Sequence, residues 1–350
     1  MAPQQDHKQN EEQVTGAIDV HTHLYPRLYI DAMKRRGPGA LPRIEGEIGS
    51  ERFIIFPEEA ERPGAGRPMG PEFWEVDAKL SFMDRFGIER SVVSLGNPWL
   101  GPFTPEESVP LARAINEELG GLEETTGGRL TALGALPSGD VDAIIREIEW
   151  IAAQPGLRGV ITGTRIADMT LDDSGLDPIW HALQAHDLVI FVHPHYASAL
   201  SELGGFGHGL PVALGFPFET SIALTRLTFA GVLERYPALR VLAAHGGGTI
   251  PFVAGRANAG WQSDPQARTR LQSPPGDSFR RLYLDAVVYH ERALRTTVDL
   301  VGAEHVSFGT DHPFSVADPQ ANLDAIAALS EPDVQELVLS ASARQLFRLP

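Results

Sequence analysis

Short apolar runs alternate with longer amphipathic segments along most of the chain. The clearest amphipathic segment spans 141–152, where apolar side chains recur three or four positions apart, as on one face of a helix. This alternation is typical of repeated βα units that build a parallel sheet. Eight runs rich in Val, Ile, Leu and Ala are the predicted strands: 17–20, 91–95, 130–136, 159–162, 188–192, 240–244, 282–286 and 306–309.

Eight βα units predict an α/β fold of the (β/α)8 TIM-barrel type, although a doubly wound open sheet produces a similar pattern. Histidines and an aspartate at the ends of the predicted strands favour the barrel. A length of 350 residues suits one barrel domain. We therefore expect a single domain over 16–350, preceded by a disordered polar tail over 1–15.

Two segments interrupt the regular alternation. Residues 37–75 contain 13 Gly or Pro in 39 positions, well above the roughly one in eight of average usage. This composition predicts a small insertion or lid after the first strand rather than a helix. A second irregular stretch, rich in Gly, Phe and Leu, covers 196–217 after the fifth strand. Long βα loops of this kind usually shape the mouth of an active site.

The chain is strongly acidic, with 29 Lys and Arg against 46 Asp and Glu and a formal net charge of -17. This charge repels phosphate backbones and anionic lipid surfaces, so neither nucleic acid nor a membrane is an expected partner. No apolar run is long enough to span a bilayer, and the first residues lack the apolar core of a signal peptide. We expect a cytoplasmic protein that acts on a small molecule.

The chain has no cysteine, which excludes disulfides, thiolate metal sites and a cysteine nucleophile. Any bound metal must therefore be held by His, Asp or Glu. The three lysines are Lys8, Lys34 and Lys79, all in the first quarter of the chain. No lysine from the middle of a barrel can bridge two metal ions or form a Schiff base. This argues against the lysine-bridged two-metal hydrolases.

Candidate chemical groups lie at the ends of four predicted strands. His21 and His23 are two residues apart on the first strand, so both imidazoles face the same side. His193 follows the fifth strand, His245 the sixth and Asp311 the eighth. Because the carboxyl ends of barrel strands converge on one face, these five groups are expected to meet. Three imidazoles and one carboxylate suit Zn²⁺ or a similar divalent ion, and the fifth group is left as an unligated base.

Each of these residues also has a simpler explanation. His193 suits a hydrogen-bonded strand end, Asp311 suits a turn cap, and His245 precedes three glycines that suit a tight turn. The convergence of all five on one face favours a single metal site over separate structural roles. His195 and His208 lie in the loop expected over that site and are candidates for substrate contact.

Three motifs resemble the amidohydrolase superfamily, and within it the branch of aminocarboxymuconate-semialdehyde decarboxylase and related nonoxidative aromatic-acid decarboxylases. They are IDVHTHLYP at 18–26, the run from GFPFETS to AAHGGG at 215–248, and FGTDHPF at 308–314. The resemblance covers about 18–347. It implies one divalent metal ion, Zn²⁺ or else Mn²⁺. The metal ligands it implies are His21, His23, His193 and Asp311, with His245 as the unligated catalytic residue.

The same resemblance implies two arginines that bind substrate carboxylates. Arg256, after the HGGG motif, matches one that a neighbouring subunit contributes, which indicates a homodimer. Arg52, near the start of the insertion, is the candidate for the other. The family has Trp where this chain has His195, so the substrate need not be the same acid.

These features predict a metal-dependent nonoxidative decarboxylase, a carbon-carbon lyase that releases CO₂ from an aromatic or unsaturated semialdehyde carboxylic acid. His245 would act as general base and acid, because the usual imidazole pKa of about 6.5 lies near working pH. The alternative is a mononuclear metal-dependent hydrolase of a lactone or amide. A third class is a ligand-binding barrel without catalysis, which would turn over no acid.

Overall fold

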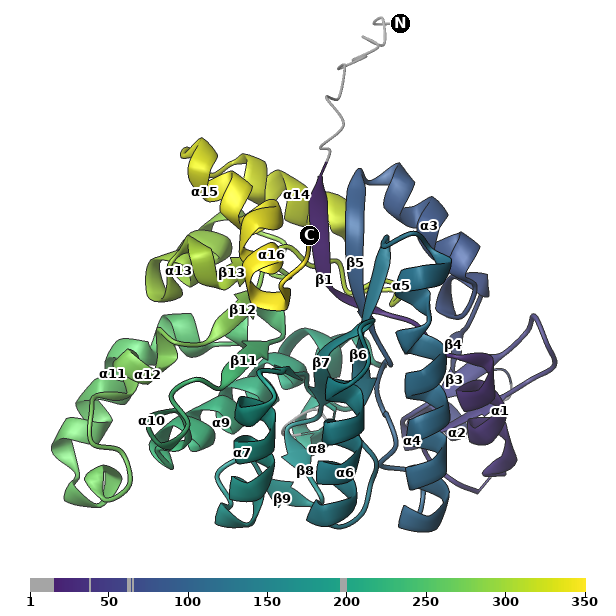
Figure 1. Ribbon diagram of the computed structural model, residues 1–350, viewed down its shortest axis with the longest axis horizontal. Coiled ribbons are helices and arrows are strands. Elements are labelled where there is room, and N and C mark those ends of the chain that lie inside the picture. Colours follow the sequence, from purple (N-terminus) through teal and green to yellow (C-terminus); the bar gives the residue numbers. More distant parts are fainter. Residues whose placement is uncertain (1–15, 38, 62–63, 65, 196–199) are drawn as a thin grey trace, which may run out of the picture.

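Eight parallel strands form a barrel at the centre of the computed structural model, and helices surround it (Figure 1). The structure describes residues 16–350 except 38, 62–63, 65 and 196–199. The tail expected over 1–15 lies outside the described residues. The barrel strands are β1 (Ala17–His23), β5 (Ile88–Ser94), β6 (Leu130–Ala135), β7 (Leu157–Thr162), β10 (Val189–Val192), β11 (Arg240–Ala243), β12 (Tyr283–Asp285) and β13 (Val306–Ser307).

The strands follow one another around the barrel in chain order, β1-β5-β6-β7-β10-β11-β12-β13. The last strand returns to the first, since Val20 N donates to Phe308 O at 3.0 Å and Thr310 N donates to His21 O at 3.2 Å. A doubly wound sheet would reverse its strand order near the middle. The predicted (β/α)8 barrel is therefore confirmed, and all eight predicted apolar runs contain or overlap a strand.

The apolar runs form strands because a barrel buries both faces of its sheet. Every residue of β6 and β10 is buried. The strand β1 extends beyond the apolar run predicted at 17–20, because Thr22 and His23 continue the pairing with Val93 and Ser94 of β5. The two histidines thus lie on the strand itself, with fixed backbones.

The helix predicted at 141–152 is present with those bounds as α6, and its Ile144, Ile148 and Ile151 are fully buried. The α-helices outside the two irregular segments are α1 (Arg27–Arg35), α3 (Val76–Arg85), α4 (Pro105–Gly120), α5 (Leu122–Thr125), α6 (Val141–Ala152), α7 (Asp177–Ala185), α9 (Phe216–Phe229), α10 (Val232–Arg235), α11 (Ile250–Ser263), α12 (Pro275–Phe279), α13 (Glu291–Val301), α14 (Pro319–Ala327), α15 (Pro332–Glu336) and α16 (Ser342–Phe347). No helix of the described residues is long and apolar enough to cross a membrane.

The Gly/Pro-rich segment forms a small antiparallel sheet beside α1, here called the lid sheet. It consists of β2 (Arg43–Glu45), β3 (Arg52–Ile54) and β4 (Arg67–Pro68), with the four-residue helix α2 (Pro57–Ala60) between the last two. The carboxylate of Glu51 accepts hydrogen bonds from Arg27 and Lys34 of α1, at 2.9 and 3.1 Å. This buried contact fastens the lid sheet to the barrel.

The second segment predicted as irregular contains more structure than its composition indicated. Its described part includes α8 (Leu200–Leu203) and a π-helical turn (Pro211–Gly215) that runs directly into α9. The expectation of an irregular loop up to 217 was therefore wrong. Proline at the first position of a helix is compatible with helical backbone, because its missing N–H would have no partner there. A short hairpin, β8 (Arg165–Ile166) and β9 (Met169–Thr170), follows β7.

Candidate metal centre and pocket

Four of the predicted residues form one buried cluster at the carboxyl ends of the strands. His21, His23, His193 and Asp311 each offer one ligand atom, and these atoms lie within 4.8 Å of one another. The Nε2 atoms of the three histidines and Oδ1 of Asp311 have no hydrogen-bond partner among the described residues. Buried polar atoms normally have hydrogen-bond partners, so a group of four potential ligand atoms without such partners fits a metal ion.

The opposite nitrogen of each histidine has a partner that orients its ring. His21 Nδ1 lies 2.5 Å from Oδ2 of Asp285, and His23 Nδ1 lies 3.1 Å from Oγ of Ser94. His193 Nδ1 lies 2.8 Å from the carbonyl oxygen of Pro194. The carboxylate and the carbonyl can only accept, so they hold a proton on Nδ1 of His21 and of His193 and leave Nε2 to bind a metal. The Ser94 hydroxyl orients the ring of His23.

The charges of the cluster also suit a cation. Burial lowers the pKa of His23 to about 4 and that of His193 well below its usual value, so both rings are neutral at pH 7. Burial disfavours charge on His21 and Asp311 as well, but the attraction between them outweighs it. The pKa of His21 rises to about 10, with help from Asp285, and that of Asp311 falls well below its usual value. Carboxylates that attract a proton to His21 attract a divalent ion for the same reason.

His245 lies beside the cluster but is not one of its four members. Its Nε2 is 3.7 Å from Oδ2 of Asp311, and its ring centre is 5.2 Å from those of His21 and His193. His245 begins the glycine turn expected from the sequence. The fold requires glycine in this turn. A Cβ atom on Gly248, where φ is +67°, would lie 2.2 Å from the carbonyl oxygen of Pro217. The need for a tight turn thus explains the three glycines, but it does not explain why the residue before them is a histidine.

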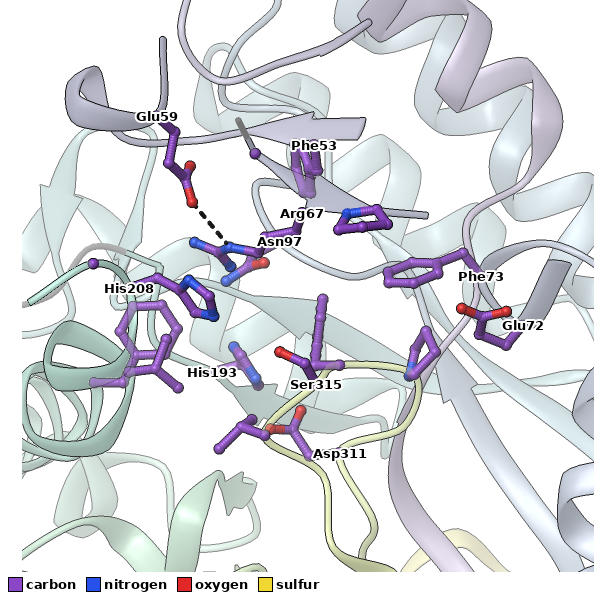
Figure 2. Close-up of a pocket in the computed structure, with 18 of the residues that line it drawn as sticks. Phe53, Glu59, Arg67, Glu72, Phe73, Asn97, His193, His208, Asp311 and Ser315 are labelled. Carbon is purple, nitrogen blue, oxygen red and sulfur yellow. Dashed lines mark hydrogen bonds and ion pairs between the residues drawn. The ribbon is translucent and has the colours of Figure 1, made fainter. Parts of the chain in front are cut away.

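A cavity of about 620 Å³ opens above the cluster. His193 and Asp311 lie on one side of it, and Phe53 and Arg67 of the lid sheet lie on the opposite side (Figure 2). His245 also lines the cavity. Aromatic side chains make up much of the remaining wall: Phe53, Phe73, Phe216 and Phe314. A volume of this size holds a small organic molecule, and apolar walls with a few polar groups are typical of ligand pockets.

Among the described residues, the arginine that lines this cavity is Arg67, not Arg52. Arg67 is largely buried, and its Nε donates to Oε1 of Glu59 at 3.4 Å (Figure 2). Its Nη2 atom is buried without a partner among the described residues. Arg52 instead donates to the carbonyl oxygen of Gly66 at 2.6 Å and is not among the residues that line the cavity. The structure therefore places Arg67 of β4 at the cavity, rather than Arg52 of the neighbouring strand β3.

The other predicted contact residues lie in different places. His208 lines the cavity near Arg67. His195 lines a separate hollow beside it, with its ring 5.2 Å from that of Trp99. Arg256 is exposed on α11 and does not line the cavity of its own chain.

Two buried residues near the centre were missed from the sequence. Asp285, at the end of β12, contacts His21 as described above. Lys79 of α3 reaches inward, with its Nζ 2.7 Å from Oγ1 of Thr22 and 2.6 Å from Nδ1 of His312. Asp285 is a polar residue next to the end of the strand predicted at 282–286, and this position was the available signal. No signal in the sequence marked Lys79, because a residue on an outer helix rarely reaches the centre of a barrel.

A (β/α)8 barrel with a buried His₃Asp group at the carboxyl ends of its strands defines a class of metal-dependent barrel enzymes. The chain belongs to the amidohydrolase family, whose model matches residues 18–349.

Several similar proteins are named as decarboxylases. The 2-amino-3-carboxymuconate-6-semialdehyde decarboxylase of Dictyostelium discoideum is 26% identical over 92% of this chain and 89% of its own length. The crystal structure of Metarhizium anisopliae IDCase in apo form is 34% identical with a TM-score of 0.88, over 95% of this chain and 97% of that one. The dihydroxybenzoic acid decarboxylase of Polaromonas sp. JS666, solved with manganese and the inhibitor 2-nitroresorcinol, is 20% identical with a TM-score of 0.76, over 96% of this chain and 98% of that one. The chain is a metal-dependent decarboxylase.

Proposed function

We propose that this decarboxylase removes CO₂ from an aromatic or unsaturated semialdehyde carboxylic acid held between the His₃Asp group and Arg67. The observation that carries the proposal is the cavity itself, which is lined by His193, His245 and Asp311 and, on the side facing His193, by the guanidinium of Arg67. In a protein with a net charge of -17, a local cation is needed to hold an anionic substrate. Arg67 lines the cavity and supplies this charge.

His21, His23, His193 and Asp311 would hold one divalent ion, Zn²⁺ in the first instance and Mn²⁺ as the alternative. When bound, the ion supplies positive charge that stabilises negative charge developing on a substrate oxygen. His₃Asp is compatible with either metal, and cellular supply decides much of the outcome.

His245 would supply the proton that replaces the carboxylate. Cleavage of the carbon-carbon bond leaves its electron pair on the ring or chain carbon and releases CO₂, and the protonated imidazole donates to that carbon. The reaction consumes one proton and needs no oxidant. The aromatic walls pack against a planar substrate and exclude water, so the proton comes from His245 and not from bulk solvent.

Arg256 would act in the cavity of a second copy of the chain, which makes a homodimer the working unit. Phe252, one helical turn before Arg256 on α11, is 87% exposed, and Ile222 of α9 is 53% exposed. The two helices adjoin, because the backbone N of Thr249 donates to Oγ of Ser221 at 2.7 Å. An exposed apolar patch beside an arginine suits a self-complementary interface.

The test is CO₂ release from a panel of aromatic and unsaturated acids by the metal-loaded protein. We expect His245→Ala to lower kcat by about 100-fold or more, while His186→Ala, at an exposed helix end, leaves it unchanged. Lactones and amides are assayed in parallel. Full activity of His245→Ala, or hydrolysis of a lactone or amide without CO₂ release, would contradict the proposal.

A further inference from the structure

One buried carboxylate contacts both the proposed metal site and the proposed proton donor. Asp285 is completely buried at the end of β12. Its Oδ2 lies 2.5 Å from Nδ1 of His21 and accepts from the backbone N of His245 at 2.9 Å. Its Oδ1 accepts from the backbone N atoms of Gly246 and Val287, at 2.9 and 3.1 Å. All four contacts join Asp285 to N–H groups, so its acceptor capacity is used on every side.

The contact with His21 fixes which of its nitrogens is available to a metal. A carboxylate can only accept, so His21 must carry a proton on Nδ1. When a metal ion replaces the second proton that the carboxylates attract to this ring, Nε2 presents its lone pair to the centre formed with His23, His193 and Asp311. This arrangement strengthens the imidazole as a ligand and prevents rotation of the ring.

The contacts with the glycine turn hold a strained backbone. His245 has φ of +57°, in the left-handed region that a residue with a side chain rarely adopts. Gly246, which follows, has φ of +61°. The N–H groups of both residues donate to Asp285, so the carboxylate stabilises the conformation that places the His245 ring beside Asp311.

We propose that Asp285 is a positioning residue that sets the His21 tautomer for metal binding and holds His245 in place for proton transfer. The inference rests on the proposed metal site and on the proposed role of His245. It goes beyond them because it makes two functions depend on one side chain that contacts neither the metal nor the substrate.

The substitution Asp285→Asn separates this role from simple packing, because it preserves shape and removes one acceptor. The amide nitrogen cannot occupy the position of Oδ1, where two N–H groups converge. It must occupy the position of Oδ2, where it faces the N–H of His245 and Nδ1 of His21. His21 Nδ1 then becomes the acceptor and the ring proton moves to Nε2, which blocks metal binding. The N–H of His245 loses its partner at the same time.

The experiment compares the wild-type protein with Asp285→Asn and with a control, Glu147→Gln. Glu147 is 3% exposed and accepts from Arg113 and Asn116 at 2.9 Å, so this control also changes a buried, bonded carboxylate to an amide. Folding is followed by circular dichroism and thermal unfolding. The dissociation constant for Zn²⁺ is measured by calorimetry with a competing chelator, and kcat is measured against pH at saturating metal.

We expect Asp285→Asn to raise the Zn²⁺ dissociation constant about 10- to 100-fold. We also expect kcat to stay lower by on the order of 10-fold at saturating metal, with a displaced pH profile. Glu147→Gln should leave both quantities unchanged. An unaltered metal affinity in folded Asp285→Asn would overturn the proposal, as would full recovery of kcat at saturating metal.

A second measurement needs no variant and applies even if Asp285→Asn does not fold. The ¹⁵N chemical shifts of His21 in the Zn²⁺-loaded wild-type protein should show a protonated Nδ1, and the opposite tautomer would overturn the proposal. Failure of the proposed function gives a different result, since the wild-type protein would then bind no divalent ion or release no CO₂. Failure of the Asp285 inference leaves both wild-type properties intact.

Discussion

Replacement of Glu51 by glutamine is expected to loosen the lid sheet in a pH-dependent way. Glu51 is 1% exposed. Its Oε1 accepts from Arg27 Nη2 and Lys34 Nζ, and its Oε2 accepts from the backbone N of Gly49 at 2.6 Å. The amide of Glu51→Gln is neutral and leaves both cations of α1 without their counter-ion.

The size of the effect follows from the pKa of Glu51. Burial raises this pKa, but the hydrogen bonds from Lys34 and Arg27 outweigh burial and lower it from 4.5 to about 2. A shift of this size corresponds to about 3 kcal/mol at most, since one pKa unit is about 1.4 kcal/mol. The folded-state pKa is depressed, so this stability is fully present above pH 4.5 and is lost as the pH falls toward 2.

The assay is urea unfolding of the wild-type protein and Glu51→Gln between pH 7 and pH 2. We expect the variant to be less stable at pH 7 and the difference to vanish as the pH falls from 4.5 to 2. Glu45→Gln is the control, because its carboxylate pairs with Arg43 but is 47% exposed, and exposed pairs contribute less than about 1 kcal/mol. A difference that is constant with pH, or an equal loss in Glu45→Gln, would refute the reasoning.

Three further predictions concern the substrate and the dimer. Arg67→Met should lower kcat/KM for the acid substrate about 10- to 100-fold, because a charge-assisted hydrogen bond to a carboxylate is lost. Arg52→Met should have a much smaller effect. Steady-state kinetics that show the two variants equally impaired would contradict this prediction. Phe252→Ser should shift sedimentation from dimer to monomer and lower activity on dilution. Arg256→Ala mixed with His245→Ala should regain part of the wild-type activity, since each mixed dimer contains one complete site, and no recovery would remove Arg256 from the partner's site.

The barrel and the metal cluster could be predicted because the relevant signals are local. Strands buried on both faces require apolar runs, and the last residues of each run face the site. His193 and Asp311 are far apart in sequence, yet each was located by its position at a strand end. The fold then brings these ends together without further information.

The lid sheet could not be predicted in the same way, because its register depends on pairing between short strands. Phe53 lies opposite Arg67 in the β3–β4 pair, so both side chains face the cavity. Arg52 is the neighbour of Phe53, and successive residues of a strand face opposite sides. A composition of Gly and Pro indicates an insertion but gives no register, so the sequence could not show that Arg67 rather than Arg52 lines the cavity of its own chain.

Contacts made by long or buried polar side chains could not be predicted from the sequence either. Lys79 reaches Thr22 and His312 from an outer helix, over a distance that only the packed structure defines. Asp285 was not singled out in the sequence, and only the structure shows its four N–H partners.

The most direct test of the central claim is the amount of CO₂ released per acid consumed, measured before and after removal of the metal. The protein is loaded with Zn²⁺ or Mn²⁺, treated with a chelator, and then reloaded. The account predicts one CO₂ per acid for the loaded protein, none after chelation, and recovery on reloading. CO₂ release that continues unchanged in the metal-free protein, or consumption of the acid without CO₂, would contradict it.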